Sequence, residues 1–196
     1  MAKKIFITGT GTDIGKTYVT GLILKKLRQS GCSAAYYKAA MSGNQRDADG
    51  HLIPGDALHV KEASGISQPL ETMCPYVYEA AVSPHLASRL EGDPVQMDVV
   101  RAGFAKVCAA YDYVTMEGSG GIVCPIDFDS SRLQLEDVIR DLELSSILVA
   151  DAGLGTINGV VLTAEYMKAK DLELKGVIFN NFHPGDVMEE DNIRMC

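Results

Sequence analysis

The chain has 196 residues, enough for one domain with a continuous core, and its 46% of hydrophobic and 22% of charged residues are typical of a globular protein rather than a disordered one. Its formal net charge of −8 argues against nucleic acid or an acidic membrane surface as a partner, because a field of that sign repels both. No apolar run reaches the roughly 18 residues of a membrane span, so we expect neither a nucleic acid nor a membrane partner.

The beginning of the chain indicates a strand rather than a secretory leader. Two lysines precede an apolar run, but the run breaks at Thr8 and Gly9, too early for the roughly 7–15 apolar residues of a secretory core. The five cysteines are scattered and lack CxxC spacing, which predicts neither a disulfide framework nor a zinc site. We therefore expect a cytoplasmic protein.

Short apolar runs alternate with stretches of helical spacing along the chain. We expect strands at residues 4–8, 34–38, 113–116, 146–150 and 176–179. We expect helices at residues 16–30, 56–64, 98–110 and 158–168, and a long polar loop at residues 39–54. This alternation predicts an α/β fold with a mainly parallel sheet and helices on both faces. The chain shows no repeat or linker, so we expect residues 1–196 to form a single domain.

A polar or glycine-rich segment follows each predicted strand. Gly9, Lys38, Glu117, Asp151 and Asn180 each come just after an apolar run. In parallel α/β sheets, ligands bind beyond the carboxyl ends of the strands. We therefore expect these residues to share one edge of the sheet and to line the ligand site.

The strongest motif is GTGTDIGKT at residues 9–17, between the first strand and the first helix. Backbone N–H groups of such a loop surround phosphate oxygens, and the helix adds the positive end of its dipole. Lys16 would reach the β- and γ-phosphates, and the Thr17 hydroxyl would bind Mg²⁺. A glycine-rich turn that contains GKT by chance is the alternative, which the strand–loop–helix context disfavours. We expect a P-loop NTPase type of fold that uses ATP with Mg²⁺.

Three more segments carry charged side chains whose roles the residue types alone leave open. Lys38 ends a strand in YYKAAMSG, and a solvated surface position is the usual one for lysine. Asp56 begins a predicted helix, where a carboxylate also interacts favourably with the helix dipole. Glu117 ends a strand and precedes glycines in MEGSGG, a common way to present a metal ligand near phosphate.

Taken together, these motifs resemble those of the dethiobiotin synthetases, in the same order and near the same spacing over almost the whole chain. The phosphate loop resembles the family's GTDTxVGKT, with Gly11 in place of aspartate and Ile14 in place of valine. The YKAAMSG segment resembles YKP-x-x-SG with Ala39 in place of proline, the GDA at Asp56 resembles an SDA-type motif, and MEGSGG resembles VEGAGG. Family members continue beyond the position of Cys196, so we expect the usual C-terminal segment to be missing here.

The resemblance implies roles for sixteen residues, some of them in more than one role. It implies catalytic roles for Lys38, Lys16 and Thr12, substrate contacts by Ser42, Thr12 and Asn158, and Mg²⁺ ligation by Thr17, Asp56 and Glu117. It implies ATP contacts by Asp13, Ile14, Gly15, Lys16, Thr17, Tyr18, Asp56, Glu117, Gly118, Ser119, Gly120 and Asn180. By residue type alone, Asn158 would belong to an ordinary capped helix and Asn180 would be a turn former. In the family, the helix start near Asn158 serves the partner subunit's site, which implies a homodimer with shared active sites.

The activity that the resemblance implies is that of an ATP-dependent ligase of biotin biosynthesis. One amine of 7,8-diaminononanoate (diaminopelargonate) takes up CO₂ as a carbamate, and the carbamate attacks the γ-phosphate of Mg-ATP. The second amine then closes the ring, giving dethiobiotin, ADP and phosphate. Positioning and charge neutralisation are what such a reaction demands of the protein.

Two other classes of function share some of these features. A P-loop switch ATPase of the partitioning or metal-insertion type would explain the loop and Asp151, but it usually carries an additional early lysine where this chain has Thr10, Gly11 and Thr12. A nucleotide-binding module without catalysis would leave Lys38 and three expected metal ligands unexplained. ATP hydrolysis without a second substrate would favour the switch, and ATP binding without turnover would favour the module.

Overall fold

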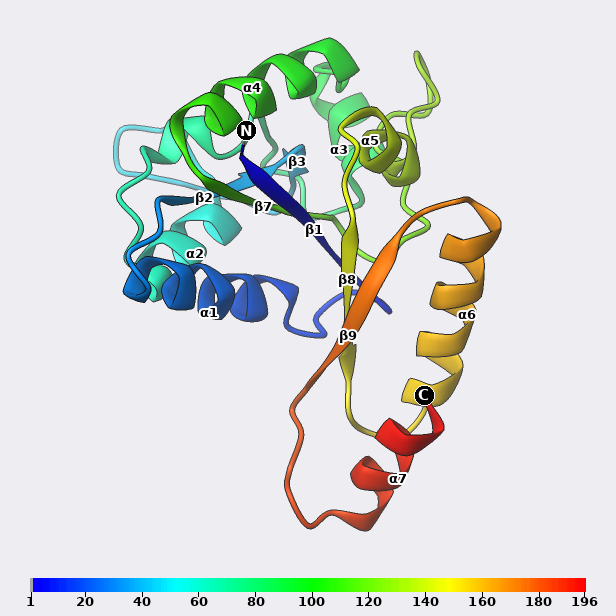
Figure 1. The fold of residues 1–196 in the computed structure, drawn as a ribbon. Helices are drawn as coiled ribbons and strands as arrows, with labels where there is room; N and C mark the ends of the chain where they lie inside the picture. Colours follow the sequence, from blue (N-terminus) through cyan, green and yellow to red (C-terminus); the bar gives the residue numbers. More distant parts are fainter. Residues whose placement is uncertain (1) are drawn as a thin grey trace.

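A computed structural model describes residues 2–196 and contains a central five-stranded sheet (Figure 1). In spatial order its strands are β2 (Ala34–Lys38), β7 (Tyr113–Glu117), β1 (Lys3–Gly9), β8 (Ser146–Asp151) and β9 (Leu174–Asn180). Every neighbouring pair in this sheet runs parallel. The parallel sheet expected from the alternating sequence pattern is therefore confirmed, and each predicted strand agrees with an observed one to within about two residues at either end.

Helices cover both faces of this sheet, as predicted (Figure 1). One face packs against α1 (Lys16–Gln29) and α2 (Gly55–Ser64), and the other against α4 (Met97–Ala110), α5 (Leu135–Asp141) and α6 (Thr156–Ala169). The remaining helices are η1 (Leu70–Thr72, a 3₁₀ turn), α3 (Pro84–Glu91) and α7 (Val187–Met195).

The strand residues are buried on both faces because successive side chains point in opposite directions. Phe6 and Ile7, neighbours on β1, are both fully buried. Ile7 packs with Val19 of α1, whereas Phe6 belongs to the larger core that includes Val100 and Phe104 of α4. This two-sided burial explains why the central strands are continuously apolar instead of alternating with polar residues.

Several short elements differ from the prediction. The expected loop at residues 39–54 contains three short strands, β3 (Ala40–Met41), β4 (Gln45–Arg46) and β5 (Leu52–Ile53). β4 pairs with β5, and β3 pairs with the distant β6 (Tyr76–Val77), a partner that local sequence cannot reveal. The sequence analysis also missed α3, α5 and α7, which are only eight, seven and nine residues long and therefore show little periodicity.

The register of the sheet brings the polar strand ends together. Lys38 lies directly opposite Glu117 across the β2–β7 pair, and Ile7, just before the phosphate loop, lies opposite Glu117 on the other side. Asp151 and Asn180 are likewise opposite each other at the ends of β8 and β9. The expectation that these polar residues share one edge of the sheet is therefore confirmed.

Within residues 2–196, no helix has both the length and the apolar character needed to cross a membrane.

Candidate active site

The phosphate loop runs from the end of β1 to the beginning of α1 and depends on glycine at its ends. Gly15, the residue before α1, has a φ of 89°, which is the left-handed region that glycine adopts without strain. A side chain at Gly9 would place its first carbon 2.5 Å from Ile14 Cδ1. No side chain caps α1, so the first N–H groups of this helix remain available to a bound anion.

Lys16, the first residue of α1, lies buried within this loop. Its ammonium donates a hydrogen bond to the Gly11 carbonyl over 2.8 Å, so the lysine folds back along the loop. Burial lowers the pKa of Lys16, and the nearby positive charge of Lys38 lowers it further. A partly desolvated ammonium attracts an anion more strongly than a hydrated one does, because less water screens the charge.

A second buried lysine stands between two carboxylates. The Lys38 ammonium donates to Glu117 Oε1 over 3.0 Å and to Asp56 Oδ2 over 2.5 Å. Burial by itself would lower the pKa of Lys38, but the charges of Glu117 and Asp56 outweigh that effect and raise it. Lys38 therefore remains a cation throughout the neutral range. It is not the solvated surface lysine that its residue type alone would suggest.

The oxygen atoms around this lysine fit the expected Mg²⁺ site. The Thr17 hydroxyl donates to Glu117 Oε1 over 2.9 Å. Neighbouring ligands of an octahedral Mg²⁺ with bonds of about 2.1 Å lie about 3.0 Å apart, so this spacing suits the ion. The Lys38 ammonium between Glu117 and Asp56 shows that the same place already attracts positive charge. Thr17, Asp56 and Glu117 thus supply hard oxygen ligands of the kind that Mg²⁺ prefers.

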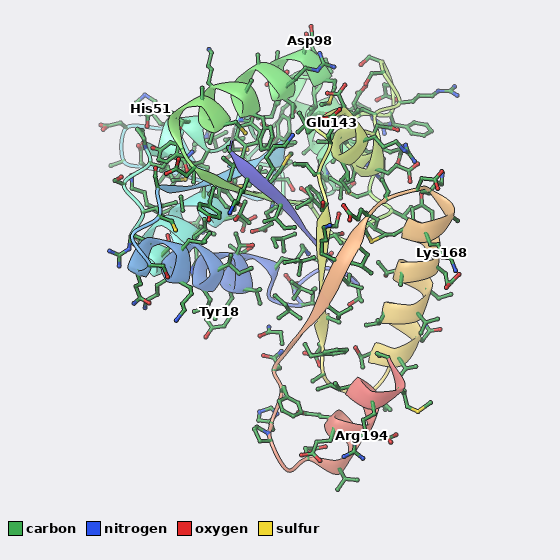
Figure 2. The ribbon with its side chains drawn as sticks, viewed as in Figure 1. Tyr18, His51, Asp98, Glu143, Lys168 and Arg194 are labelled. Atoms are coloured by element: carbon green, nitrogen blue, oxygen red, sulfur yellow. The ribbon has the colours of Figure 1, made fainter. Side chains whose placement is uncertain are left out.

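Most of the residues expected at the site line one hollow of about 640 Å³. They come from the phosphate loop and the first turn of α1, the ends of β2 and β7, the residues just after β3 and β7, and the first turn of α2: Thr12, Asp13, Gly15, Lys16, Thr17, Tyr18, Lys38, Ser42, Asp56, Glu117, Ser119 and Gly120. Tyr18 sits on the outer side of α1 with 53% of its surface exposed (Figure 2). His59 also lines the hollow and was not predicted from the sequence. It follows Asp56 by three residues on the same predicted helix, and this spacing could have indicated that both side chains share one helix face.

Four expected residues lie outside the lining of this hollow. Ile14 and Asn180 contact each other behind the loop, where the Asn180 amide donates to the Ile14 carbonyl over 3.0 Å. Gly118 is packed beneath the site, because a side chain there would come within 2.8 Å of the Phe6 ring. Asn158 lines a separate, shallower hollow at the beginning of α6. Whether these residues contact ATP or substrate stays a prediction.

A buried asparagine, Asn44, holds the segment after β3 against the first turn of α2. The Asn44 amide donates to the carbonyls of Met41 and Tyr78 over 2.9 and 2.8 Å, and its oxygen accepts from the Gly55 N–H over 2.9 Å. Gly55 begins α2 and directly precedes Asp56. Asn44 therefore positions the first turn of α2, and the residue could not be recognised from its place in the expected loop.

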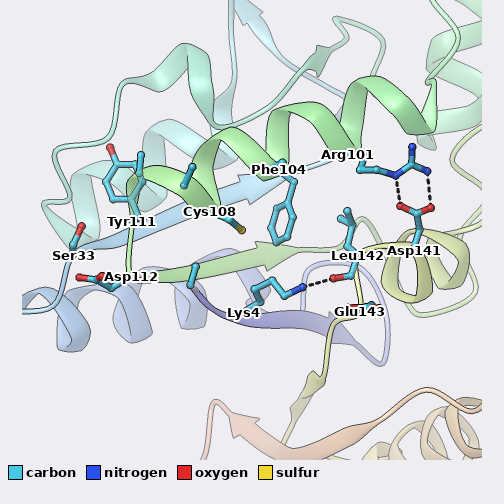
Figure 3. Close-up of a pocket in the computed structure, with 14 residues that line it drawn as sticks. Lys4, Ser33, Arg101, Phe104, Cys108, Tyr111, Asp112, Asp141, Leu142 and Glu143 are labelled. Carbon is cyan, nitrogen blue, oxygen red and sulfur yellow. Dashed lines mark hydrogen bonds and ion pairs between the residues drawn. The ribbon is translucent and has the colours of Figure 1, made fainter.

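A larger hollow, of about 740 Å³, lies at the opposite edge, beside the amino ends of the strands (Figure 3). Both cations that line it are already bonded: Lys4 donates to the Leu142 carbonyl over 2.7 Å, and the Arg101 guanidinium makes two bonds to Asp141 over 2.8 and 2.6 Å. Burial raises the pKa of the Cys108 thiol in the same hollow, which keeps the thiol protonated and unreactive. This hollow is therefore larger than the one at the carboxyl edge but offers fewer groups that could act on a ligand.

Solved structures with a similar fold are distant in sequence. The MinC:MinD cell division protein complex of Aquifex aeolicus aligns with 99% of this chain and 77% of its own at 16% identity, with a TM-score of 0.56. The kinase domain of the Escherichia coli tyrosine kinase ETK aligns with 90% of this chain and 66% of its own at 19% identity, with a TM-score of 0.52. At these identities the likeness establishes the P-loop fold alone.

Curated relatives are far more similar in sequence. A protein of Brachyspira hyodysenteriae named ATP-dependent dethiobiotin synthetase BioD is 46% identical over 100% of this chain and 86% of its own length. A protein of the same name from Clostridium novyi is 47% identical over 100% of this chain and 82% of its own. A family model described as an AAA domain also matches residues 3–195. The chain therefore belongs to the dethiobiotin synthetase family.

Proposed function

We propose that this chain catalyses the ATP-dependent closure of the dethiobiotin ring from 7,8-diaminononanoate and CO₂, with release of ADP and phosphate. Its relatives are named for an ATP-dependent synthetase with that product. The observation that carries the proposal is the second buried lysine: Lys38 shares one hollow with Lys16 and the phosphate loop. A reaction between an anionic carbamate and a triphosphate needs positive charge at that place.

The reaction has two bond-forming steps after one amine has taken up CO₂. A carbamate oxygen attacks the γ-phosphorus, and the bond from that phosphorus to the bridging oxygen breaks as ADP leaves. The second amine then attacks the carbamate carbon, losing a proton, and phosphate departs with the bonding pair. Lys16 and Lys38 hold the two anions together in the first step, where their mutual repulsion opposes contact.

The oxygen ligands of Thr17, Asp56 and Glu117 would hold the Mg²⁺ ion that accompanies ATP. When bound, this ion would offset the charge of the β- and γ-phosphates. Thr12 and Ser42 line the same hollow and would face the diamine substrate. The Ser42 hydroxyl donates to the Val82 carbonyl over 2.6 Å, which leaves its lone pairs free to accept a hydrogen bond from a substrate amine.

The proposal includes a homodimer in the cytoplasm. Leu154, Val161 and Leu162, at or near the start of α6, are 91%, 44% and 62% exposed, an apolar surface that a second copy of the chain would cover. Asn158 lines a hollow on this surface and not the hollow at the phosphate loop of its own chain, as a residue serving the other subunit's site would. Light scattering coupled to size exclusion tests the dimer, with Leu162→Glu expected to give monomers and a dimer in that variant counting against this surface.

Mass spectrometry tests the reaction. We expect dethiobiotin from a mixture of the protein, Mg-ATP, bicarbonate and the diamine, and none when any one component is omitted. ATP hydrolysis that proceeds equally without the diamine would instead indicate a switch ATPase. ATP binding without any turnover would indicate a nucleotide-binding module.

A further inference from the structure

Two adjacent tyrosines on β2 point to opposite faces of the sheet. Tyr36 packs with Leu24 of α1 and Val60 of α2, whereas Tyr37 packs with Phe104 on the α4 side. Both are fully buried, at 0% and 1% exposure. The Tyr37 hydroxyl donates to a backbone carbonyl of α4, far from the phosphate loop. The two tyrosines therefore have the same side chain and nearly the same burial, but their hydroxyl groups have different surroundings.

The hydroxyl of Tyr36 reaches the floor of the candidate active site. It lies 3.3 Å from Glu117 Oε2, a long and therefore weak hydrogen bond in which the phenol is the donor. Tyr36 and Lys38 are two residues apart and share one face of β2, which places the phenol directly behind the Lys38–Glu117 pair.

The backbone of Tyr36 is clamped on the side of β2 that has no neighbouring strand. The buried Gln68 side chain accepts from the Tyr36 N–H over 2.7 Å and donates to the Tyr36 carbonyl over 3.0 Å. One amide group thereby takes the place of the next strand in the hydrogen-bond ladder. This clamp fixes the position from which the phenol approaches the carboxylate.

The two oxygens of Glu117 have separate surroundings. Oε1 accepts from the Thr17 hydroxyl and the Lys38 ammonium, over 2.9 and 3.0 Å. Within residues 2–196, Oε2 accepts a hydrogen bond from Tyr36 alone. A carboxylate held by one oxygen from behind presents the other oxygen to the front in a defined direction.

We propose that Tyr36 is a positioning residue that holds Glu117 by Oε2 so that Oε1 faces Thr17 and the phosphate-bound Mg²⁺. This inference rests on the proposed function only in taking Glu117 as a Mg²⁺ ligand. Groups that orient a metal ligand from behind commonly change metal affinity or activity about 10- to 100-fold when they are removed. Because the Tyr36 bond is long, the lower end of that range applies here.

The test compares Tyr36→Phe with its matched control, Tyr37→Phe. For Tyr36→Phe we expect a rise of about tenfold in the Mg²⁺ concentration that gives half-maximal ADP binding by calorimetry, with ADP affinity in EDTA unchanged. A purely structural loss would lower the melting temperature without this dependence on Mg²⁺. Tyr37→Phe should leave both binding measurements at their wild-type values. An equal Mg²⁺ requirement in the two variants would overturn the proposal.

Two further variants separate the hydrogen bond from the shape of the side chain. Replacing Tyr36 with p-fluorophenylalanine fills the space of the hydroxyl without supplying a donor. This variant should therefore show the raised Mg²⁺ requirement expected of Tyr36→Phe, and it provides the test if Tyr36→Phe itself folds poorly. Replacing Tyr36 with p-aminophenylalanine keeps an N–H donor and should restore the wild-type Mg²⁺ requirement. Failure of this rescue in a folded protein would also overturn the proposal. Because the readout is nucleotide binding, it stands whether or not the chain makes dethiobiotin.

Discussion

The two edges of the sheet hold hollows of similar size that differ in how their charges are arranged. At the amino edge, Arg101 and Asp141 form a two-bonded pair whose side chains are 52% and 29% exposed. At the carboxyl edge, the side chains of Lys38 and Glu117 are 7% and 1% exposed. Of these two pairs, only Lys38 and Glu117 are removed from water, and charges in such surroundings can act strongly on a ligand. Room alone does not identify the site.

The largest expected effect is that of removing the buried cation. Lys38→Ala should lower dethiobiotin formation by about 10²–10³ or more while Mg-ATP still binds, because the carbamate loses its preorganised partner. Single-turnover kinetics and nucleotide titration measure the two effects. The matched control is Lys4→Ala, whose ammonium is bonded at the other edge and should leave turnover unchanged. Wild-type turnover in Lys38→Ala would contradict the role assigned to this lysine.

A second prediction concerns the close packing beneath the carboxyl edge. Gly118→Ala would place a carbon 2.8 Å from the Phe6 ring and 3.0 Å from Leu135, both buried. We expect the free energy of unfolding to fall by about 1–3 kcal/mol and turnover to fall as Glu117 shifts. Gly176→Ala on β9, where a side chain meets nothing within 4 Å, is the control for urea unfolding. Equal stability of the two variants would show that this packing can relax.

A third, smaller effect should follow the titration of the phosphate-loop lysine. The pKa of Lys16 is lowered by burial and then by Lys38, so the unfolded chain binds the proton more tightly than the folded one. The folded protein therefore gains stability as pH rises through the lowered pKa toward the ordinary value of 10.5. Lys16→Met should raise the melting temperature at neutral pH, and its advantage should shrink as pH approaches 10.5. A stability difference that does not depend on pH would refute this account.

The smallest effect is expected at the amino edge. Arg101→Ala breaks an exposed ion pair, so turnover should stay at the wild-type value and any loss of stability should be slight and weaker at high salt. Steady-state kinetics and thermal melts at two salt concentrations measure this. A large loss of activity would mean that the amino edge acts on the reaction, and the contrast between the edges would fail.

The sheet could be predicted from the sequence because a strand buried on both faces consists of consecutive apolar residues. The runs around Phe6 and Leu148 are continuously apolar, the run around Val114 is mostly so, and glycine or a carboxylate comes soon after each of them. Once the strands were predicted to be parallel, the phosphate loop, Lys38 and Glu117 could be placed at one edge, because the carboxyl ends of parallel strands lie on the same side. The short helices and the β3–β6 pairing escaped prediction because few residues form them and their stability depends on distant partners.

By itself, the sequence determined the alternation of strands and helices, the phosphate loop and the order of the polar strand ends. Each of these features depends on residues that are close together in the sequence. Only the tertiary structure decided which of these groups touch. Lys38 meets Glu117 across 79 positions and Tyr36 meets it across 81, and the Gln68 clamp spans 32. Such contacts depend on register and on which face of a strand each side chain takes. Each of these residue types could pair with many others, and the packing of the sheet brings these particular partners into contact.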